Sequence, residues 1–324
     1  MLAPLAALYG AVAAWRMAQP GREVGVPVLC IGNLTLGGSG KTPAALAVGR
    51  LLGAAGARPF FLTRGYGGAL SGPVTVDAAR HSARDVGDEP LLLARIAPTI
   101  VARDRVAGAE AAKAAGASVI IMDDGFQNPS LVKQLAILAV DGRRGIGNAR
   151  VFPAGPLRAP LAAQLARAHA LVVIGEGTAA ASVAAAGRGL ALFSGRLVPD
   201  PAALGALAGH RVFAFAGIGD PEKFFATLDA AGIAAPVKRS YPDHHRYTAA
   251  EAAALAEEAE RRDLMLLTTE KDLARLAGDE AVAPLAARAR ALPVTFVLDE
   301  PERFGRFVRE ALARQGSNRV IAKP

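Results

Sequence analysis

The chain has 324 residues, of which 52% are hydrophobic and 5% aromatic, and its formal net charge is +8. This length predicts about two domains with an extensive core. The positive charge favours an anionic partner, but the basic residues are scattered arginines without a Lys/Arg block, which argues against nucleic-acid binding. The single cysteine, Cys30, excludes an internal disulfide framework and is typical of a buried residue in a reducing compartment.

The N-terminal segment, MLAPLAALYGAVAAWRM, has no charged side chain before Arg16. It lacks the basic start of a secretory signal, and it is shorter than the about 20 apolar residues of a spanning helix. Helical spacing gathers four apolar residues near one face: Leu5, Leu8, Val12 and Trp15. Taken alone, the segment fits a helix in a bilayer interface and a buried first helix equally well.

Short apolar runs then alternate with alanine-rich helical stretches, which predicts an α/β fold with a parallel sheet covered on both faces. The expected strands are residues 26–31, 58–63, 99–102, 117–122, 136–140, 170–174, 211–216, 264–268 and 294–298. A Pro- and Gly-punctuated stretch near residue 200 predicts a larger unit, 1–200, and a smaller α/β unit, 201–324. The last helix is a candidate to pack back on the larger unit.

The first stretch with chemical meaning is VPVLCIGNLTLGGSGKTP, residues 26–43, an apolar run followed by a glycine-rich turn. Such a turn lets backbone N–H groups converge on phosphate oxygens at the start of the next helix. Lys41 would reach the β- and γ-phosphates, and the Thr42 hydroxyl would hold Mg²⁺. The strict P-loop pattern has glycine where this chain has Thr35, so the match is incomplete. The candidate nucleotide-binding residues are Gly37, Gly38, Ser39, Gly40, Lys41 and Thr42.

A second apolar run, ASVIIMDDGFQ, ends in Asp123 and Asp124. Carboxylates at this place lie at the carboxyl edge of a parallel sheet, where ligands of open α/β folds bind. An acidic strand end is also the expected Mg²⁺ partner of a phosphate-binding loop. The sequence leaves open which of the two aspartates binds the metal.

Two familiar branches of the P-loop class are disfavoured. Partition-type ATPases carry a lysine directly before the double glycine, where this chain has Leu36. GTPases carry Asn/Thr-Lys-x-Asp, whereas TTEKD (268–272) places Lys271 and Asp272 side by side. The remaining function is transfer of a phosphate group to an acceptor. This reaction requires a base or positioning residue for the acceptor hydroxyl.

The segment DVGDEP, residues 85–90, is one candidate source of that residue, because it places Asp88 and Glu89 on a turn before a helix. Acidic residues at this place also serve routinely as helix caps.

The segment YPDHHRYTAAE, residues 241–251, is the other candidate. It places His244 on a loop before a helix that begins with a predicted capping box of Thr248 and Glu251. A solvated surface residue is the simpler interpretation of a lone histidine on a loop.

Together these motifs resemble one family, the tetraacyldisaccharide 4′-kinases of lipid A biosynthesis. The P-loop segment alone is shared by many enzymes, whereas the ordered set is specific. The family also lacks the glycine at the position of Thr35, but the glutamate that often follows FPAGPLR is Ala159 here, which puts a role for an acid there in doubt. The matching segments are GNLTLGGSGKTP (32–43), RGYGG (64–68), GDEP (87–90), DDGFQ (123–127), DGRRGIGN (141–148), FPAGPLR (152–158), FAGIGDPEKFF (213–225), DHHRY (243–247) and TTEKD (268–272).

The resemblance implies transfer of the γ-phosphate of ATP, with Mg²⁺, to the 4′-hydroxyl of a tetraacylated disaccharide 1-phosphate. It implies a nucleotide in the cleft between two domains and a DHHRY loop that closes over it. On the matching GDEP and Asp-His residues, it implies Asp88 as the base and His244 beside it, tuning its pKa. It also implies substrate contacts from Arg64, Gln127 and Glu89.

An acyl-chain substrate lies in a membrane, so the resemblance favours the interfacial interpretation of the first helix. It implies a peripheral protein at the cytoplasmic face of the bacterial inner membrane, without nucleic acid or an obligate protein partner. A positive surface suits anionic lipids, at about 1 kcal/mol per basic residue near the membrane. The candidate phosphate contacts are Arg143, Arg144, Arg150 and Arg158.

Two other functions compete. One is a nucleotide-dependent switch or metallochaperone, against which the absent guanine motif and the absent extra lysine count. The other is a peripheral membrane scaffold with a degenerate nucleotide site, which the intact Lys41, Thr42 and Asp88 disfavour. Neither explains GDEP and DHHRY in one chain.

Overall fold

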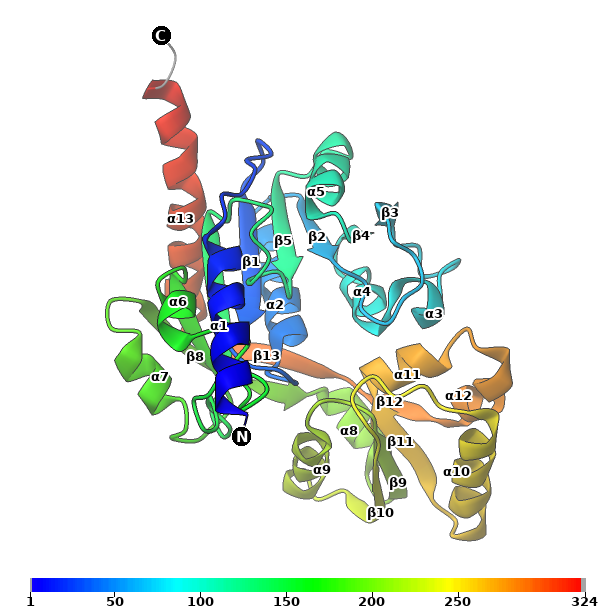
Figure 1. Cartoon of the computed structure of the whole chain (residues 1–324). Coiled ribbons are helices and arrows are strands. Elements are labelled where there is room, and N and C mark those ends of the chain that lie inside the picture. Colours follow the sequence, from blue (N-terminus) through cyan, green and yellow to red (C-terminus); the bar gives the residue numbers. More distant parts are fainter. Residues whose placement is uncertain (1, 322–324) are drawn as a thin grey trace.

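The computed structural model describes residues 2–321, and the side chains of residues 2–313. Within this range the chain forms one large and one small sheet (Figure 1). The large sheet contains β1 (Val28–Asn33), β2 (Pro59–Thr63), β3 (Val74–Thr75), β4 (Thr99–Val101), β5 (Val119–Asp123), β6 (Leu135–Asp141), β7 (Ala170–Ile174), β8 (Ala191–Pro199) and β13 (Val294–Leu298). Their order is β13-β8-β7-β6-β1-β5-β2-β4-β3, and of these nine strands only the edge strands β3 and β13 run antiparallel to their neighbours.

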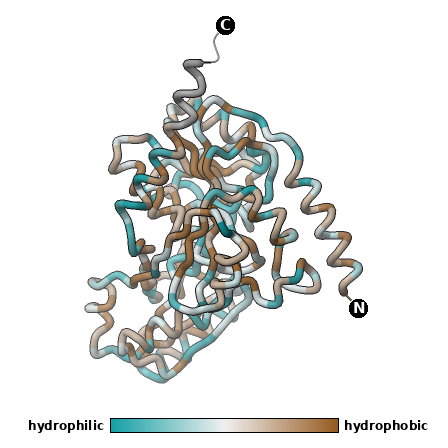
Figure 2. Tube along the Cα trace, turned by 90° about the vertical axis from the view of Figure 1, so that its left-hand side faces the viewer, coloured by the Kyte–Doolittle hydropathy of each residue, from teal (hydrophilic) through white to brown (hydrophobic). Residues whose placement is uncertain are grey.

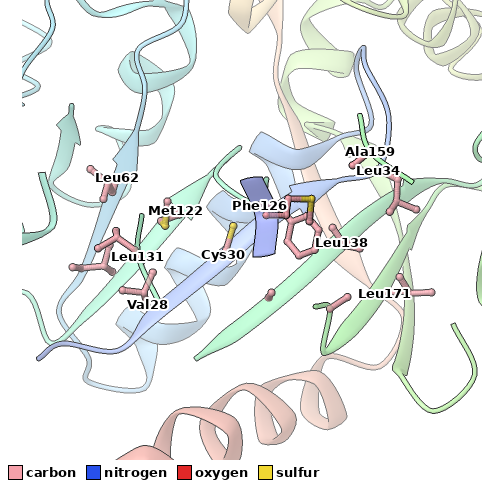
Figure 3. Close-up of a cluster of buried hydrophobic side chains, with 14 of the residues drawn as sticks. Val28, Cys30, Leu34, Leu62, Met122, Phe126, Leu131, Leu138, Ala159 and Leu171 are labelled. Carbon is pink, nitrogen blue, oxygen red and sulfur yellow. The ribbon is translucent and has the colours of Figure 1, made fainter. Parts of the chain in front are cut away.

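Helices cover both faces of the large sheet, as the continuous apolar runs predicted. One face, which carries Cys30, Met122 and Leu138, packs against α1 (Ala3–Ala18), α5 (Arg105–Ala114), α6 (Leu161–Leu165) and α7 (Ala181–Ala186) (Figure 3). The opposite face, with Leu29 and Ile31, packs against α2 (Lys41–Ala54), α4 (Asp88–Leu93) and α13 (Pro301–Ile321). The short α3 (Ala83–Val86) precedes α4.

The small sheet is parallel throughout. Its order is β10 (Ala234–Ser240), β9 (Arg211–Ala216), β11 (Met265–Thr269) and β12 (Arg290–Leu292). The face with Phe213 and Phe215 packs against α10 (Ala249–Arg261), the 3₁₀ helix η1 (Glu280–Val282) and α12 (Ala283–Arg288). The other face packs against α8 (Pro201–Leu207) and α9 (Pro221–Ala230). The remaining helix, α11 (Glu270–Leu276), contacts α4 of the large unit.

The nine predicted strands are all present, and each lies within two residues of its expected bounds. The strands β3, β8, β10 and β12 were missed. The reason is visible in β10, whose AAPVKRS sequence lies on a sheet edge with alternately exposed residues and offers no apolar run.

The chain leaves the large sheet after β8 and returns to it at β13. These two strands pair from Val294–Pro199 to Leu298–Gly195. The backbone N–H of Asp200 donates to the carbonyl of Pro293 at 2.9 Å, so the outgoing and returning connections lie together. The predicted smaller unit, 201–324, therefore wrongly includes residues 294–298, which pair with β8. The helix α13 packs on the large sheet, as the sequence suggested for the last helix. An apolar strand pattern does not say which sheet the strand joins.

The N-terminal helix α1 lies along one side of the molecule (Figure 2). Its large apolar side chains are exposed. Its inner side is formed by small or flexible residues, and Gly10 lies against Pro160 and Val151. The interpretation of a buried first helix is therefore wrong. None of the helices in residues 2–321 is long and apolar enough to cross a membrane. The exposed apolar side chains are Leu2, Leu5, Leu8, Tyr9, Val12 and Trp15.

Candidate active site

The phosphate-binding loop joins β1 to α2. Gly37 and Gly40 have φ values of 91° and 80°, a conformation that glycine adopts without strain. A side chain at Gly40 would also be blocked, because its Cβ would lie 2.9 Å from Ile174. This turn points the first N–H groups of α2 at one place, at the positive end of a helix. Lys41 and Thr42 are the first two residues of that helix, and both are buried.

Asp124 is the carboxylate beside the loop lysine. Nζ of Lys41 lies 3.5 Å from Oδ2 of Asp124. The guanidinium of Arg158 donates to both oxygens of Asp124, at 2.5 and 3.1 Å. Burial raises the pKa of Asp124, but Lys41 and Arg158 outweigh it and hold that pKa below its ordinary value. Asp124 is thus a charged anchor for two cations that face the phosphate-binding loop.

Asp123 is in a different state, although it is the adjacent residue. Its Oδ2 accepts a hydrogen bond from the Thr42 hydroxyl at 3.1 Å, and its Oδ1 is buried without a hydrogen-bond partner in the described chain. Burial first, and then the charge of Glu89, raise the pKa of Asp123 to about 7. A divalent cation would satisfy this carboxylate, and Mg²⁺ sites of this kind take their other ligands from water and phosphate. Thr42 and Asp123 therefore fit Mg²⁺.

A cavity of about 420 Å³ lies between the loop and the small unit, a volume that suits a nucleotide. Both apolar and charged side chains line this cavity. The apolar group comprises Leu36, Leu46, Leu197, Ile218, Phe224, Leu292 and Val294, and the polar group includes Lys41, Glu89, Asp124, Arg158, Lys223, Asp243, His244 and Lys271.

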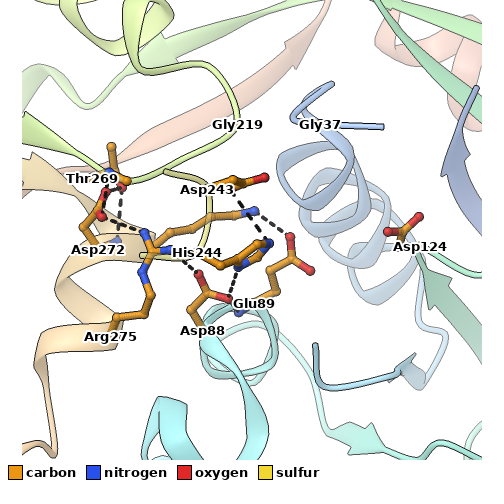
Figure 4. A network of polar contacts seen from close by, with 12 residues as sticks. Gly37, Asp88, Glu89, Asp124, Gly219, Asp243, His244, Thr269, Asp272 and Arg275 are labelled. Atoms are coloured by element: carbon orange, nitrogen blue, oxygen red, sulfur yellow. Dashed lines mark hydrogen bonds and ion pairs between the residues drawn. The ribbon is translucent and has the colours of Figure 1, made fainter. Parts of the chain in front are cut away.

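Asp88 and His244 come from opposite units and meet in a smaller pocket that shares His244 and Tyr66 with this cavity (Figure 4). Nδ1 of His244 lies 3.3 Å from Oδ1 of Asp88, whose side chain is 2% exposed. Burial raises the pKa of Asp88, but the hydrogen bond from His244 and the charges of Lys271 and Arg275 lower it to about 2. The same hydrogen bond raises the pKa of His244. The pair is therefore an ionised carboxylate hydrogen-bonded by an imidazole whose pKa is raised.

The loop that carries His244 is shaped by local contacts. His244 has a φ of 56°, its backbone N–H donates to Gly217, and its ring lies against Tyr66 at 4.8 Å between centroids. The predicted capping box of Thr248 and Glu251 is confirmed at the start of α10. Glu251 also lies 3.1 Å from Nε2 of the neighbouring His245, which is thereby held away from Asp88.

The small unit makes close contact with the phosphate-binding loop. A Cβ at Gly219 would lie 2.4 Å from the backbone nitrogen of Gly38, so only glycine allows this approach. Arg143 donates to Asp220 at 2.5 Å, and Arg144 donates to the carbonyl of Gly219 at 3.1 Å. Both arginines were candidate phosphate contacts, but in the structure they hold the small unit in place.

Of the three residues predicted to contact the substrate, one lines the cavity and two do not. Glu89 lines the cavity, but it pairs with Lys271 at 2.6 Å. Gln127 donates to Asn33 and to Gln164, and it lies beside Arg158 rather than in the cavity. The exposed Arg64 does not line this cavity in the described part of the chain.

Two further details differ from expectation. Asp88 and Glu89 begin α4 instead of preceding it. Of the four arginines proposed for phosphate, Arg158 alone lines the cavity, while Arg150 is exposed.

Sequence reasoning missed the cations that the small unit contributes, Lys271 and Arg275. Both lie on α11, Lys271 within the TTEKD segment and Arg275 three residues after its end. A usable signal was present in EKDLAR, where Asp272 and Arg275 are three residues apart on one helical face and can form an ion pair.

Phosphate can bind at the start of α2, while Asp88 is held as a proton acceptor in the adjacent pocket that shares His244 with the nucleotide cavity. That division defines the class of protein, a nucleotide-dependent phosphotransferase built on a P-loop. A family model, tetraacyldisaccharide-1-P 4′-kinase, matches residues 1–313. The chain belongs to this family.

Individual relatives carry the name of the same family. The chain is 55% identical over 314 residues to a tetraacyldisaccharide 4′-kinase of Rhodopseudomonas palustris strain BisB5, covering 96% of this chain and 92% of the relative. It is 52% identical over 328 residues to the enzyme of the same name from a Bradyrhizobium strain, covering 100% of this chain and 95% of the relative. A crystal structure of LpxK from Aquifex aeolicus in complex with ATP has a TM-score of 0.73 at 28% identity, covering 96% of this chain and 98% of that one.

Proposed function

We propose that the protein transfers the γ-phosphate of ATP to the 4′-hydroxyl of a tetraacyldisaccharide 1-phosphate in lipid A biosynthesis. The observation that carries the proposal is the 3.3 Å contact of Asp88 with His244, because His244 also lines the cavity of the phosphate-binding loop. Family membership supports the same reaction and disfavours the switch, metallochaperone and scaffold alternatives.

Residues of the large unit would bind the nucleotide. The N–H groups from Gly37 to Thr42 would bind phosphate oxygens, and Lys41 would neutralise the charge on the transferred group. Arg158, held by Asp124 at 2.5 Å, would add a second cation. Thr42 and Asp123 would hold Mg²⁺, which would neutralise further phosphate charge when it is bound.

The acceptor side falls to Asp88. Its low pKa keeps it ionised, so it accepts a hydrogen bond from a hydroxyl and orients that hydroxyl, and it takes the proton as the new bond to phosphorus forms. A weak base is sufficient because the transition state of phosphoryl transfer is loose and depends mainly on positioning and on charge neutralisation. His244 would hold the carboxylate in place from the small unit.

Helix α1 would contact the membrane. Leu5, Leu8 and Trp15 are 58%, 65% and 65% exposed on one helix, which is the arrangement of an interfacial anchor. Tyr9 continues this surface to Phe152, with ring centroids 5.6 Å apart. We propose that the protein is peripheral at the cytoplasmic face of the inner membrane, with anionic lipids as partners of its basic surface.

The testing experiment follows label from γ-labelled ATP into a tetraacyldisaccharide 1-phosphate in detergent micelles. Wild-type protein should label the lipid, and Asp88→Ala should lower turnover by about two to four orders of magnitude while it still binds ATP. Asp77→Ala, which removes an exposed carboxylate of the same unit, should match wild type. Unlabelled lipid together with slow ATP hydrolysis would instead favour a nucleotide-dependent switch.

A further inference from the structure

The TTEKD segment has no assigned role in the reaction, yet its Asp272 is completely buried and has many partners. Its Oδ1 accepts hydrogen bonds from the backbone N–H of Gly217 at 2.9 Å and from the Tyr247 hydroxyl at 2.7 Å. The same oxygen accepts from Nη2 of Arg275 at 2.6 Å. Its Oδ2 accepts from the Thr269 hydroxyl at 2.6 Å, at the start of α11.

These partners come from two loops and one helix of the small unit that reach the active site. Gly217 begins the loop whose Gly219 lies against the phosphate-binding loop. Tyr247 ends the loop that carries His244, and Arg275 is the cation beside Asp88. One buried carboxylate thus connects two active-site loops and one helix. A cluster with this number of satisfied hydrogen bonds holds its members in a single arrangement.

Arg275 extends this cluster across the boundary between the units (Figure 4). Its side chain is 7% exposed, and its Nη1 lies 3.4 Å from Oδ2 of Asp88. Within the described residues, Nη1 and Nε of Arg275 and Oδ2 of Asp88 have no hydrogen-bond partner. The guanidinium therefore binds Asp272 through Nη2 and presents Nη1 toward Asp88.

We propose that Arg275 is a positioning residue for Asp88 in phosphoryl transfer, and that Asp272 holds Arg275 in place. The proposal rests on the role assigned to Asp88 above. His244 approaches one oxygen of the carboxylate and Arg275 the other, so its rotation is restricted from both sides. Both partners belong to the small unit. Asp88 is consequently in its working orientation only when the small unit is in contact with the large one.

The test measures kcat, KM for ATP and the pH profile of kcat for full-length Arg275→Met and Arg275→Lys in detergent micelles. Arg275→Met should lower kcat by about tenfold to a hundredfold, because a small misplacement of a reacting group has that effect. KM for ATP should change by less than about threefold, since Arg275 does not line the nucleotide cavity. Arg275→Lys, which keeps the charge, should recover part of the loss.

The pH profile separates positioning from a general loss of structure. His244, Lys271 and Arg275 all lower the pKa of Asp88. Arg84, Arg246 and Asp279 line the same small pocket. Glu89, the residue after Asp88, is itself paired with Lys271. Removal of the Arg275 charge should therefore raise the pKa of Asp88, and the acid limb of the profile should move to higher pH. Unchanged kcat and an unchanged acid limb in Arg275→Met would overturn the proposal.

Arg95→Met is the matched control, because Arg95 forms a different ion pair between the units, with Glu270 at 3.0 Å. It should keep wild-type turnover, and an equal loss there would point to docking of the small unit in general and against a specific role of Arg275. Asp88→Asn with Arg275→Met completes a double-mutant cycle. The arginine change should have less effect in that background, and an equal effect would also overturn the proposal.

These outcomes are distinguishable from a failure of the proposed function. Full turnover in Asp88→Ala would remove the role of Asp88 itself. A large loss in Asp88→Ala with no change in Arg275→Met would overturn only the positioning role. Asp272→Asn offers a second route if Arg275→Met does not fold. It keeps the shape of the side chain but weakens the bond to Arg275, and it should lower kcat more than it raises KM for ATP.

Discussion

The pKa values of adjacent residues can shift in opposite directions when their partners differ. Asp123 and Asp124 are an example. Lys41 and Arg158 hold the pKa of Asp124 low, whereas burial raises that of Asp123 to about 7. Asp124 has a φ of 53°, which turns the chain directly after β5 and separates the directions of the two side chains. The sequence left open which of the two aspartates binds Mg²⁺. We propose that it is Asp123.

The metal assignment predicts a difference between two amide substitutions. Asp123→Asn should raise the Mg²⁺ concentration needed for half-maximal turnover by about tenfold or more, because it removes a charged ligand. Asp124→Asn should lower turnover through Lys41 and Arg158 while that midpoint changes less. The measurement is turnover against Mg²⁺ at fixed ATP. Equal midpoints in both variants would contradict the assignment.

The pair of Asp88 and His244 makes a prediction about protonation. The charge and hydrogen bond of Asp88 raise the pKa of His244, so Asp88→Asn should lower it. With the pKa raised in the folded state, His244 stabilises the fold below its unfolded pKa, and this contribution is lost as pH rises through the folded pKa. NMR titration is feasible because the chain has five histidines. An unchanged titration of His244 in the variant would show that the contact is absent in solution.

Among the elements, those defined by local sequence were predictable and those defined by pairing were not. The turn before α2 and the capping box of α10 follow from residues a few positions apart, and both were recognised. Arg275 was missed because nothing near it in sequence shows that α11 contacts α4. The same holds for β13, whose apolar pattern is clear but whose partner β8 is about a hundred residues away.

The helix α1 carries a prediction of its own. Leu5→Ser with Leu8→Ser should weaken binding to vesicles that contain anionic lipid, because each leucine contributes up to about 2 kcal/mol when it leaves water. Vesicle sedimentation measures the effect. Leu192→Ser, a change at an exposed leucine of β8, should leave binding unaltered. If the α1 variant sediments like wild type, the exposed face of α1 does not contact lipid.

At the scale of the whole molecule, the site exists only while two units are in contact. The large unit supplies the phosphate-binding loop and Asp88, and the small unit supplies His244, Lys271 and Arg275. Sequence motifs identified members of both sets, but their distances depend on how the units meet, which no short segment specifies. At Gly219 and Gly38 the backbones of the two units come so close that there is no room for a Cβ at Gly219.

Gly219→Ala tests the importance of this approach. Its methyl group would meet backbone that has no room to yield, 2.4 Å from the nitrogen of Gly38, so the small unit should be displaced. We expect turnover to fall about tenfold to a hundredfold and KM for ATP to rise, since the loop borders the nucleotide cavity. Gly205→Ala, in a helix of the same unit with open space around it, is the control. Normal kinetics in Gly219→Ala would mean that the units do not close this tightly during turnover.

The pairing of β8 with β13 has a consequence for the architecture of the chain. Because Asp200 and Pro293 are hydrogen-bonded neighbours, the whole small unit is an insertion into a connection that a tight hairpin would otherwise make. A chain in which residues 201–292 are deleted and a short turn joins the two ends should retain the nine-stranded sheet and its phosphate-binding loop. Such a protein would be a minimal nucleotide binder, and the transferase would be that binder with a second domain inserted into one hairpin.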